Sequence, residues 1–270
     1  MLLINRNMKK FYIIIIQLSF FILSFISCNK DNTSSTIDEN YGTPCPGMPT
    51  ITDIDGNTYN TVLIGDQCWM KENLKVTHYP NGEAIPNITN DREWEALENN
   101  NTDDAYCFYD NNANSEYGAL YTYAAAIGDN WTRDNAQGQG ICPDGWHLPS
   151  DEEWKILEGT ADTQFPVGDS EWDDYGSRGY DSGTHMKSTS GWESNGNGDN
   201  SSGFAALPGG GRDYDGGVFS YAGYYGYWWS ATEGISNTSW NRHLGYISAD
   251  VHRSYNSKSY GYSVRCTRDY

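Results

Sequence analysis

Aromatic side chains crowd one short stretch of the 270-residue chain. Eight of them fall within 16 residues, separated by glycines: Tyr214, Phe219, Tyr221, Tyr224, Tyr225, Tyr227, Trp228 and Trp229. Flat rings flanked by Asn, Asp and Arg can stack on pyranose sugars while the polar groups hydrogen-bond the sugar hydroxyls. On a strand, Tyr227 and Trp229 face one way and Trp228 the other, so at least one of these rings belongs to the core. The outward-facing candidates for sugar binding are Tyr221, Tyr224, Tyr225, Trp240 and Arg242.

The sequence contains no catalytic motif. A Gly-x-Ser-x-Gly elbow, a His-Glu-x-x-His pair and a Walker loop are all missing. The five histidines are scattered, and a lone histidine is more often a core or surface residue than a base. The 36 acidic side chains make chance pairs with the spacing of glycoside hydrolases inevitable, so such pairs carry no information. We expect a protein without catalysis; an enzyme acting on extracellular polysaccharide or protein is the alternative.

Two segments are rich in oxygen atoms that could bind calcium. Asp53–Asn57 lacks the later oxygens and the closing Glu of an EF-hand, so a turn is the better interpretation. The loop Asn195–Ser201 offers Asn197 and Asp199 as calcium ligands, although a solvated loop is the simpler interpretation. The Glu-Pro-Asn and Gln-Pro-Asp sequences of calcium-dependent lectins do not occur. No other cofactor or metal is expected.

The N-terminus predicts where the protein is located. Met1–Lys10 is basic, Phe11–Ile26 is apolar apart from three polar residues, and Ser27 precedes Cys28. This pattern is typical of a lipoprotein signal peptide at 1–27 with Cys28 as the lipidated residue. The apolar run is shorter than the about 20 residues of a membrane span, and an uncleaved anchor is the alternative. Both interpretations place the rest outside the cytoplasm, and we expect a lipid-anchored, surface-exposed protein of the outer membrane.

The segment 28–44 is polar and predicts a flexible tether before a domain at 45–270. A chain that begins at Cys28 has 14 basic and 36 acidic side chains, a formal net charge of −22, because Arg6, Lys9 and Lys10 are lost. This charge argues against a nucleic-acid partner, since phosphate binding needs clustered Lys and Arg. The expected partners are the membrane, through the lipid anchor, and an extracellular polysaccharide or another surface protein.

Rings must replace aliphatic side chains in the core. After residue 27 the chain has 25 Leu, Ile and Val residues against 34 aromatic residues. Few aliphatic residues and a high net charge would ordinarily indicate disorder. Each buried ring, however, removes roughly 150–250 Å² from water. The composition therefore predicts a folded domain with a core of Trp and Tyr.

The cysteine count predicts two disulfides and one free thiol. Five cysteines remain if Cys28 carries lipid, and an extracytoplasmic location permits disulfides. The preferred pairs are Cys142 with Cys266 and Cys45 with Cys68, and Cys107 is left over as a buried thiol. The first pair closes a long loop, which stabilises the fold by about 4 kcal/mol on loop-entropy grounds. Neither C-x-x-C spacing nor zinc-ligand histidine spacing occurs, so a metal cluster is not expected.

Local patterns predict a small set of elements. A hairpin is expected over Ile51–Gly65, and helices are expected over Asp91–Asn99 and Tyr117–Ile127. Ser150 and Glu153 can form a capping box, which predicts a helix over Asp151–Leu157. The predicted later strands are Phe204–Leu207, Tyr227–Ala231, Trp240–Ile247 and Tyr260–Thr267. Between them, 159–203 is expected to be an irregular insertion with Trp172, Tyr175, Tyr180 and Trp192 as aromatic anchors.

Seven segments, in this order along the chain, form a recognisable set: Asp53–Tyr59, Ile64–Leu74, Tyr117–Tyr121, Cys142–Trp154, Gly203–Gly210, Tyr227–Thr232 and Tyr262–Cys266. Together they resemble the Fibrobacter succinogenes major paralogous (FISUMP) domain. The resemblance covers roughly 45–270 and implies a secreted or surface domain, often on lipoproteins, with no established catalytic role. The helix start at Gly145–Trp154, Leu207–Gly210 and Val264–Cys266 are also similar, more distantly, to the formylglycine-generating enzymes of the C-type-lectin-like fold.

That second resemblance implies an α+β, C-type-lectin-like fold with a small twisted antiparallel sheet, two main helices and long irregular loops. It does not carry the enzyme activity over. The enzyme uses two nearby reactive cysteines late in the domain, whereas only Cys266 follows Cys142 here. We therefore predict a binding or adhesion module, with polysaccharide as the first ligand; a structural subunit of a surface appendage is a further alternative.

Overall fold

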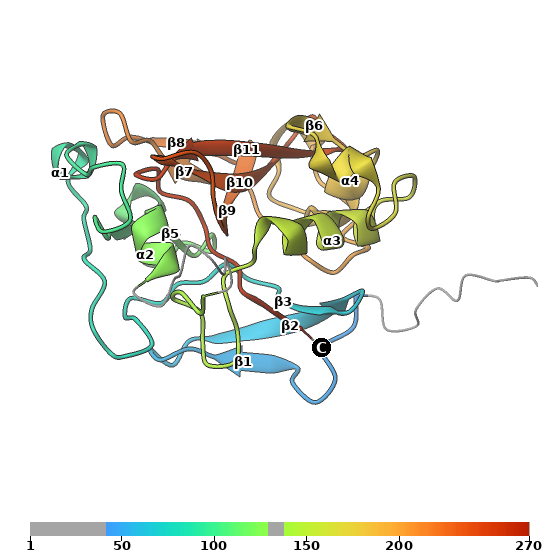
Figure 1. Cartoon of the computed structure of the whole chain (residues 1–270), viewed down its shortest axis with the longest axis horizontal. Coiled ribbons are helices and arrows are strands. Elements are labelled where there is room, and N and C mark those ends of the chain that lie inside the picture. The colour runs from blue at the N-terminus through green and yellow to red at the C-terminus, as the bar shows by residue number, and fades with distance from the viewer. Residues whose placement is uncertain (1–41, 129–137, 270) are drawn as a thin grey trace, which may run out of the picture. The chain divides into compact units, whose positions relative to one another are not determined.

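The computed structural model describes residues 42–128 and 138–269, and it contains two main sheets (Figure 1). The proposed lipidation site Cys28 lies outside the described residues. A four-stranded antiparallel sheet has the order β1-β2-β3-β12. Its strands are β1 (Thr50–Thr52), β2 (Thr58–Ile64), β3 (Gln67–Met70) and β12 (Thr267–Asp269). The predicted hairpin over Ile51–Gly65 is thus confirmed.

The second sheet has six strands in the order β6-β11-β10-β9-β7-β8. The strands are β6 (Gly176–Arg178), β7 (Gly209–Arg212), β8 (Phe219–Ala222), β9 (Tyr225–Glu233), β10 (Thr238–Gly245) and β11 (Val251–Ser257). All neighbours are antiparallel except β7 and β9, which pair in parallel at Gly210 and Gly226. A separate two-stranded sheet joins β4 (Tyr106–Phe108) to β5 (Ala119–Tyr121).

The helices are short, apart from one. They are α1 (Asp91–Glu95), α2 (Tyr123–Ile127), α3 (Asp151–Ala161) and α4 (Ser182–Met186), with 3₁₀ turns at Tyr109–Asn111, Ser170–Asp173 and Glu193–Asn195. No helix within the described ranges is long and apolar enough to cross a membrane. The fold is α+β, as predicted.

The capping box at the start of α3 is confirmed. The Ser150 hydroxyl accepts a hydrogen bond from the Glu153 amide at 3.2 Å, and the Glu153 carboxylate accepts one from the Ser150 amide at 2.7 Å. Trp154 and Leu157 are buried, also as predicted. The helix continues past Leu157 to Ala161, because this last turn packs its alanine into the same core.

The prediction of one helix over Tyr117–Ile127 is wrong. The first half forms β5, in which Leu120 pairs with Cys107 and the Tyr121 amide donates to the Tyr262 carbonyl at 2.8 Å. The helix starts only after Thr122, whose hydroxyl caps it by accepting from the Ala125 amide. Pairing with distant strands thus overrides the helical spacing of the apolar residues. The helix predicted over Asp91–Asn99 is shorter as well and ends at Glu95.

Two of the later strands were predicted correctly and two were not. β9 and β10 contain the predicted strands, although β10 ends at Gly245. Phe204–Leu207 makes only an isolated bridge, since Ala205 takes a left-handed φ of 54° that interrupts an extended strand. Over 260–266 the chain makes isolated bridges only. The two-residue spacing predicts that Tyr260, Tyr262, Val264 and Cys266 share one face. The last three belong to one buried cluster, and Tyr260 is partly buried against it.

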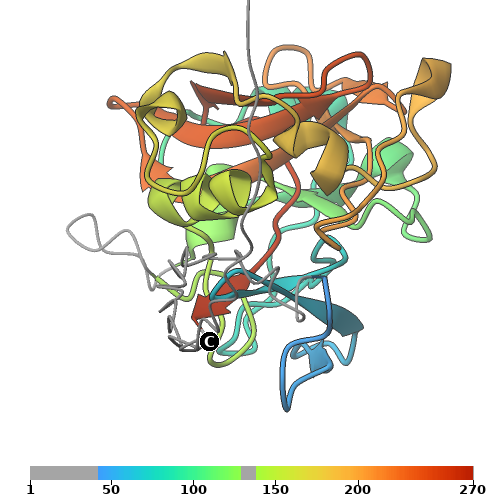
Figure 2. The same cartoon turned by 90° about the vertical axis from the view of Figure 1, so that its right-hand side faces the viewer.

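Helix α3 lies between the two sheets (Figures 1 and 2). The core around it joins Trp69 of β3, Trp154 of α3, Trp228 of β9 and Phe204. The ring of Trp154 has its centroid 5.0 Å from that of Trp69, 5.8 Å from Phe204 and 6.5 Å from Trp228. These contacts confirm a core built from rings.

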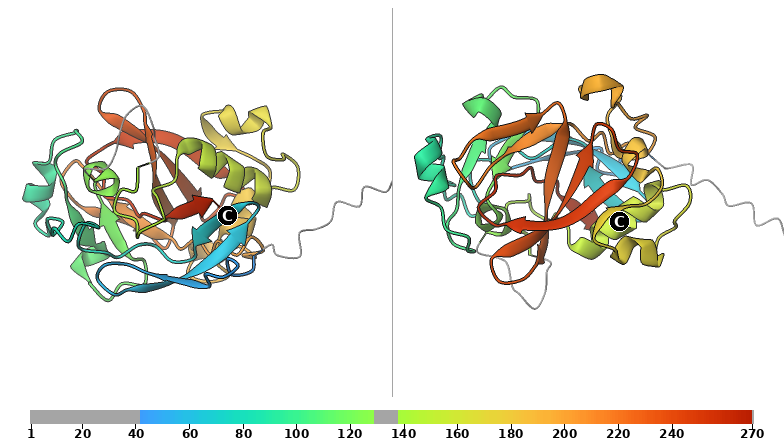
Figure 3. Two further views of the ribbon diagram at one scale, coloured as in Figure 1. Left: turned by 60° about the horizontal axis from the view of Figure 1, so that its bottom comes forward. Right: turned by 90° about the horizontal axis from the view of Figure 1, so that it is seen from above.

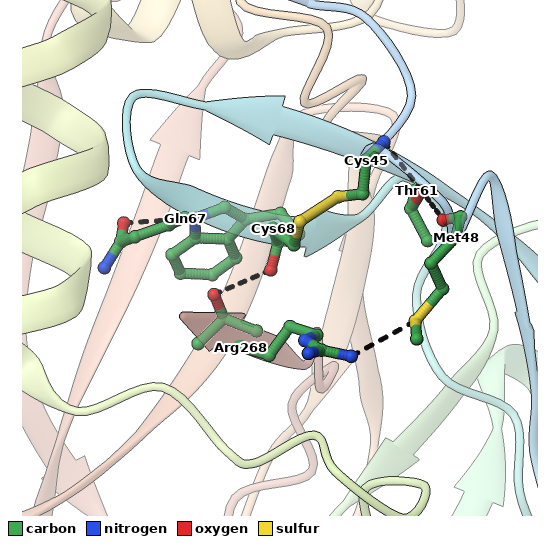
Figure 4. The surroundings of a disulfide bond; sticks show 8 residues. Cys45, Met48, Thr61, Gln67, Cys68 and Arg268 are labelled. Carbon is green, nitrogen blue, oxygen red and sulfur yellow. Dashed lines mark hydrogen bonds between the residues drawn. A yellow bond between two sulfur atoms is a disulfide. The ribbon is translucent and has the colours of Figure 1, made fainter. Parts of the chain in front are cut away.

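Both predicted disulfides are present. Cys45 lies 5.8 Å from Cys68 between Cα atoms, and Cys142 lies 5.9 Å from Cys266. Figure 4 shows the first of them, beside Thr61, whose hydroxyl accepts from the Cys45 amide and donates to the Met48 carbonyl. Cys107 is the free, buried thiol, as expected, and burial raises its pKa to about 12.

Candidate binding cleft

The six-stranded sheet separates two chemically different environments. On one face, Arg242 of β10 and Arg253 of β11 point toward α3 and meet its carboxylates. His243 follows Arg242 and His252 precedes Arg253. These two histidines point to the opposite face, because side chains alternate along a strand. In the right panel of Figure 3, which looks from above, strands of this sheet lie nearest the viewer.

A cavity of about 530 Å³ opens on the face away from α3, and we call it the tyrosine cleft. Six tyrosines line it: Tyr175, Tyr214, Tyr221, Tyr227, Tyr260 and Tyr262. Its size lies within the range of roughly 300–1,000 Å³ that is typical of small-molecule sites. The other lining side chains are two histidines, two aspartates, two serines and one asparagine.

The two histidines form a stacked pair on the floor of the cleft. His243 and His252 are cross-strand partners, and their ring centroids lie 4.1 Å apart at an interplanar angle of 17°. Burial lowers the pKa of His243 to about 3, with a further contribution from His252, and burial also lowers the pKa of His252. Both rings are therefore neutral at pH 7, each with one N–H donor and one acceptor nitrogen. Their Nδ1 atoms are buried and have no hydrogen-bond partner among the described residues.

A ladder of tyrosine rings forms one wall. Tyr227 stacks on Tyr262 at 4.9 Å and 11°, Tyr262 stacks on Tyr260 at 5.1 Å and 17°, and Tyr225 stacks on Tyr227 at 6.0 Å. Because the inner rings cover each other's faces, a ligand there would meet ring edges and hydroxyls. Burial raises the pKa of Tyr227, Tyr260 and Tyr262, so these phenols stay protonated. The Tyr262 hydroxyl accepts from Asn256 Nδ2 at 3.0 Å.

Exposed rings stand at the ends of the cleft. Tyr175 is 60% exposed, Tyr221 is 55% exposed and Tyr214 is 43% exposed. Tyr221 has a φ of +70°, a left-handed conformation that is uncommon for a residue with a side chain. Its ring lies edge-on to Tyr225 with a centroid distance of 5.5 Å. Backbone strain of this kind concentrates at ligand-binding sites.

Among the described residues that line the cleft, the charged side chains are Asp213 and Asp215. Asp213 accepts a hydrogen bond from the Ser220 hydroxyl at 3.0 Å. Burial raises the pKa of Asp213, and the negative charge of Asp215 raises it further. The described residues that line the cleft include neither Lys nor Arg.

Comparison with known families identifies the domain that carries this cleft. The Fibrobacter succinogenes major domain matches residues 62–268. The chain belongs to this family. No curated protein and no solved structure matches it. The resemblance to the FISUMP domain is thereby confirmed. The six-stranded sheet and the cleft lie within the matched residues, whereas β1 and the first half of β2 precede them.

Behind the cleft, this major domain holds a charged cluster of Glu158, Asp151, Arg178, Arg242 and Arg253. The Glu158 carboxylate pairs with the guanidinium groups of Arg178 and Arg242, and its side chain is fully buried. Asp151 pairs with Arg242 and Arg253, each at 2.7 Å. Burial alone would raise the pKa of Asp151, but the two arginines hold it well below its ordinary value. Burial lowers the pKa of Arg178 to about 10, against the opposing charge of Glu158.

The five ring and arginine candidates from the sequence have different positions. Tyr221 lines the cleft, and Tyr225 packs between Tyr221 and Tyr227 beside it. Tyr224 is exposed but packs on Tyr246, outside the cleft lining. The prediction that Arg242 faces outward is wrong. Arg242 is 1% exposed, because two carboxylates hold its guanidinium group inside the charged cluster.

Trp240 also lies outside the cleft lining. The Arg253 guanidinium covers its ring at 3.6 Å from the centroid, and the Tyr255 ring packs on it at 5.3 Å. Of the four anchors expected in the insertion, Trp172 and Trp192 are buried as predicted. The anchor role of Tyr175 and Tyr180 is wrong, since both are 60% exposed.

Sequence reasoning missed Tyr175, the histidine pair and Asp213. The sequence predicts Tyr175 only as an aromatic anchor of the insertion, and it gives no reason to pair the histidines. The sequence does contain one indication of this site. His252, Ser254 and Asn256 alternate along a strand, so three polar groups lie on the same face. The partner strand and its register were needed to bring His243 opposite His252.

The oxygen-rich segments use their oxygens internally. Asn197 Oδ1 accepts from the Trp192 amide at 3.0 Å, and Asp199 accepts from the Ser201 amide and contacts His185 Nδ1, each at 2.9 Å. Within 42–128 and 138–269, no group of three His, Cys, Asp or Glu side chains could hold a metal ion. Calcium at Asn197 and Asp199 stays a prediction. Asp53 closes the β1–β2 turn by accepting from the amides at 55 and 57.

Proposed function

We propose that this chain is a non-catalytic, lipid-anchored surface protein that binds polysaccharide in the tyrosine cleft. The observation that carries the proposal is the composition of the cleft: exposed rings at its ends, protonated phenols along one wall and neutral imidazoles on its floor. Sugars offer apolar C–H faces and hydroxyls that both donate and accept. Rings and neutral donors match both features.

The N-terminal segments complete the proposal. Lipid on Cys28 and the polar tether at 28–44 would hold the domain at a distance from the outer membrane, where it meets extracellular polymers. We further propose a C-type-lectin-like arrangement for the domain, on the strength of α2, α3 and the bridge from Cys142 to the terminal segment. Sugar binding in this cleft would then rely on rings and side-chain donors instead of calcium.

One observation favours a second candidate, an enzyme that hydrolyses polysaccharide. Asp213 and Asp215 share the cleft, and a carboxyl with a raised pKa is what a general acid needs. A glycosidase would lose turnover when Asp213 is changed to Asn. A binding module would keep its ligand after the same change.

Binding to a glycan array tests the proposal. The full chain, purified in detergent, should retain at least one class of polysaccharide, and Tyr221→Ala should weaken that binding at least tenfold. Tyr180→Ala is the matched control. Tyr180 is 60% exposed, close to the 55% of Tyr221, but it is not among the residues that line the cleft. Binding to no glycan, or equal loss in both variants, would contradict the proposal.

Turnover separates the binder from the enzyme. The bound polysaccharide should remain intact after prolonged incubation with the wild-type chain. Release of reducing ends that stops with Asp213→Asn would establish the enzyme instead. Self-association of the chain without any glycan would indicate the appendage subunit.

A further inference from the structure

The aromatic contacts of the cleft form one continuous track across the sheet. Tyr175 contacts His252 at 6.3 Å between ring centroids, and His252 stacks on His243 at 4.1 Å. From His243 the track continues to Tyr227 at 5.2 Å and on through Tyr225 to Tyr221. It therefore begins and ends at an exposed tyrosine.

The track is long compared with a single sugar. It crosses from β11 to β8, which are four strand spacings apart in the sheet. At about 4.8 Å per spacing, this corresponds to roughly 20 Å, several times the width of one sugar ring. The ring faces available for stacking lie at the two ends, whereas the middle offers hydroxyls and imidazole nitrogens. A monosaccharide could reach only one of these ends.

The charge of the track restricts the ligand further. The two histidines are neutral, the tyrosines are protonated, and the two charges in the lining are the carboxylates Asp213 and Asp215. An anionic chain such as a polyuronate or a sulfated glycan would meet like charge, and the described lining residues offer it no Lys or Arg to pair with. Arg253, which follows the lining residue His252 in the chain, faces α3, where Asp151 pairs with it and the Trp240 ring packs on it.

We infer that the cleft binds an internal stretch of several units of an uncharged polysaccharide chain, with Tyr175 and Tyr221 as the platforms for sugar rings at its two ends. This inference rests on the proposed glycan binding and specifies the class of glycan. It also assigns a binding role to Tyr175, which lies 46 residues before Tyr221 in the sequence.

Oligosaccharides of increasing length test the inference. The probes are the one- to six-unit oligomers of β-1,4-linked glucan, xylan and mannan, titrated calorimetrically into the full chain, with oligogalacturonates as charged counterparts. For the neutral series that binds, affinity should rise at least tenfold between two and six units. Oligogalacturonates of equal length should bind at least tenfold more weakly.

Variants at the two ends separate this inference from the proposed function. Tyr175→Ala and Tyr221→Ala should each weaken six-unit binding at least fivefold, and Tyr180→Ala should leave it unchanged. Three results would overturn the inference of an extended, uncharged ligand while leaving glycan binding intact. They are an affinity that does not depend on length, binding that Tyr175→Ala does not affect, and equal binding of oligogalacturonate. Binding to none of these oligomers would overturn the inference, and the array result would then decide on the function independently.

Discussion

The two faces of the six-stranded sheet use the same strands for opposite purposes. Toward α3, Arg242 and Arg253 meet Glu158 and Asp151, so each buried carboxylate contacts two guanidinium groups. On the cleft face, the neighbouring residues of β10 and β11 are histidines whose pKa values are lowered by burial and which carry no charge. Charged side chains thus lie where opposite charges contact them, and the floor of the cleft is formed by neutral imidazoles.

This difference follows from what surrounds each face. A charge enclosed between a helix and a sheet is tolerated only with opposite charges and hydrogen bonds around it. A cleft open to water can keep phenol and amide groups unpaired, because water satisfies them until a ligand takes its place. The faces should therefore respond differently to the same kind of change.

The largest effect is expected from Glu158→Gln. Removing this buried charge leaves Arg178 and Arg242 without their main partner and should lower the free energy of unfolding by about 3–5 kcal/mol. Urea unfolding at pH 7 measures it. Glu152→Gln is the control, since the Glu152 side chain is 76% exposed and pairs only with Lys155 at 2.7 Å. A loss below about 1 kcal/mol for Glu158→Gln would show that the charged cluster does not depend on its central carboxylate.

The next effect is the pH dependence of stability, which should fall in a different pH range for each face of the sheet. In the unfolded chain His243 binds a proton near pH 6.5, whereas in the folded chain its pKa is about 3. Stability should therefore fall as pH drops from 6.5 toward 3, with a slope of up to about 1.4 kcal/mol per pH unit from this group. In His243→Phe that contribution disappears, which urea unfolding at each pH from 7 to 3 would reveal.

Asp151 supplies the contrasting case on the charged face. Its folded pKa lies below the ordinary value of 3.8, so its contribution is complete above that value and is lost as pH falls below it. Asp151→Asn should therefore lower the free energy of unfolding at neutral pH. It should reduce the dependence of that free energy on pH only in the most acidic range. Identical pH profiles for the His243 and Asp151 variants would remove the distinction between the faces.

A smaller effect is expected from the tyrosine ladder. Tyr262→Phe removes the hydroxyl that accepts from Asn256 and should cost about 0.5–1.5 kcal/mol in thermal or urea unfolding. Tyr260→Phe is matched to it in ring stacking, but its hydroxyl has no hydrogen bond among the described residues, and we expect less than about 0.5 kcal/mol. Equal losses in the two variants would mean that the hydrogen bond contributes nothing.

The smallest effect tests the strain at Tyr221. Both Tyr221→Ala and Tyr221→Gly remove the ring, so both should weaken glycan binding alike. Alanine keeps the cost of a left-handed φ, whereas glycine does not, and the glycine variant should be the more stable by about 0.5–1 kcal/mol. An alanine variant as stable as the glycine variant would show that the backbone stores no strain at this position.

Local features and the class of the fold could be predicted from the amino-acid sequence alone. Ser150 and Glu153 fixed the start of α3, since a capping box needs only residues three apart. The inward face of Tyr262, Val264 and Cys266 followed from the two-residue period. The composition predicted a core of aromatic rings. The cysteine count, together with the extracytoplasmic location expected from the N-terminus, predicted the two disulfides.

The cleft could not be predicted without the three-dimensional arrangement of the strands. Helical spacing misassigned Tyr117–Ile127 because the hydrogen bonds of β5 go to partners far away in the sequence. Arg242 was assigned to the surface because its partners, Asp151 and Glu158, lie on a helix more than 80 residues earlier. Tyr175 reaches Tyr221 through rings of three different strands. Each of these positions depends on strand register and on which face a neighbouring element covers, and a local pattern contains neither.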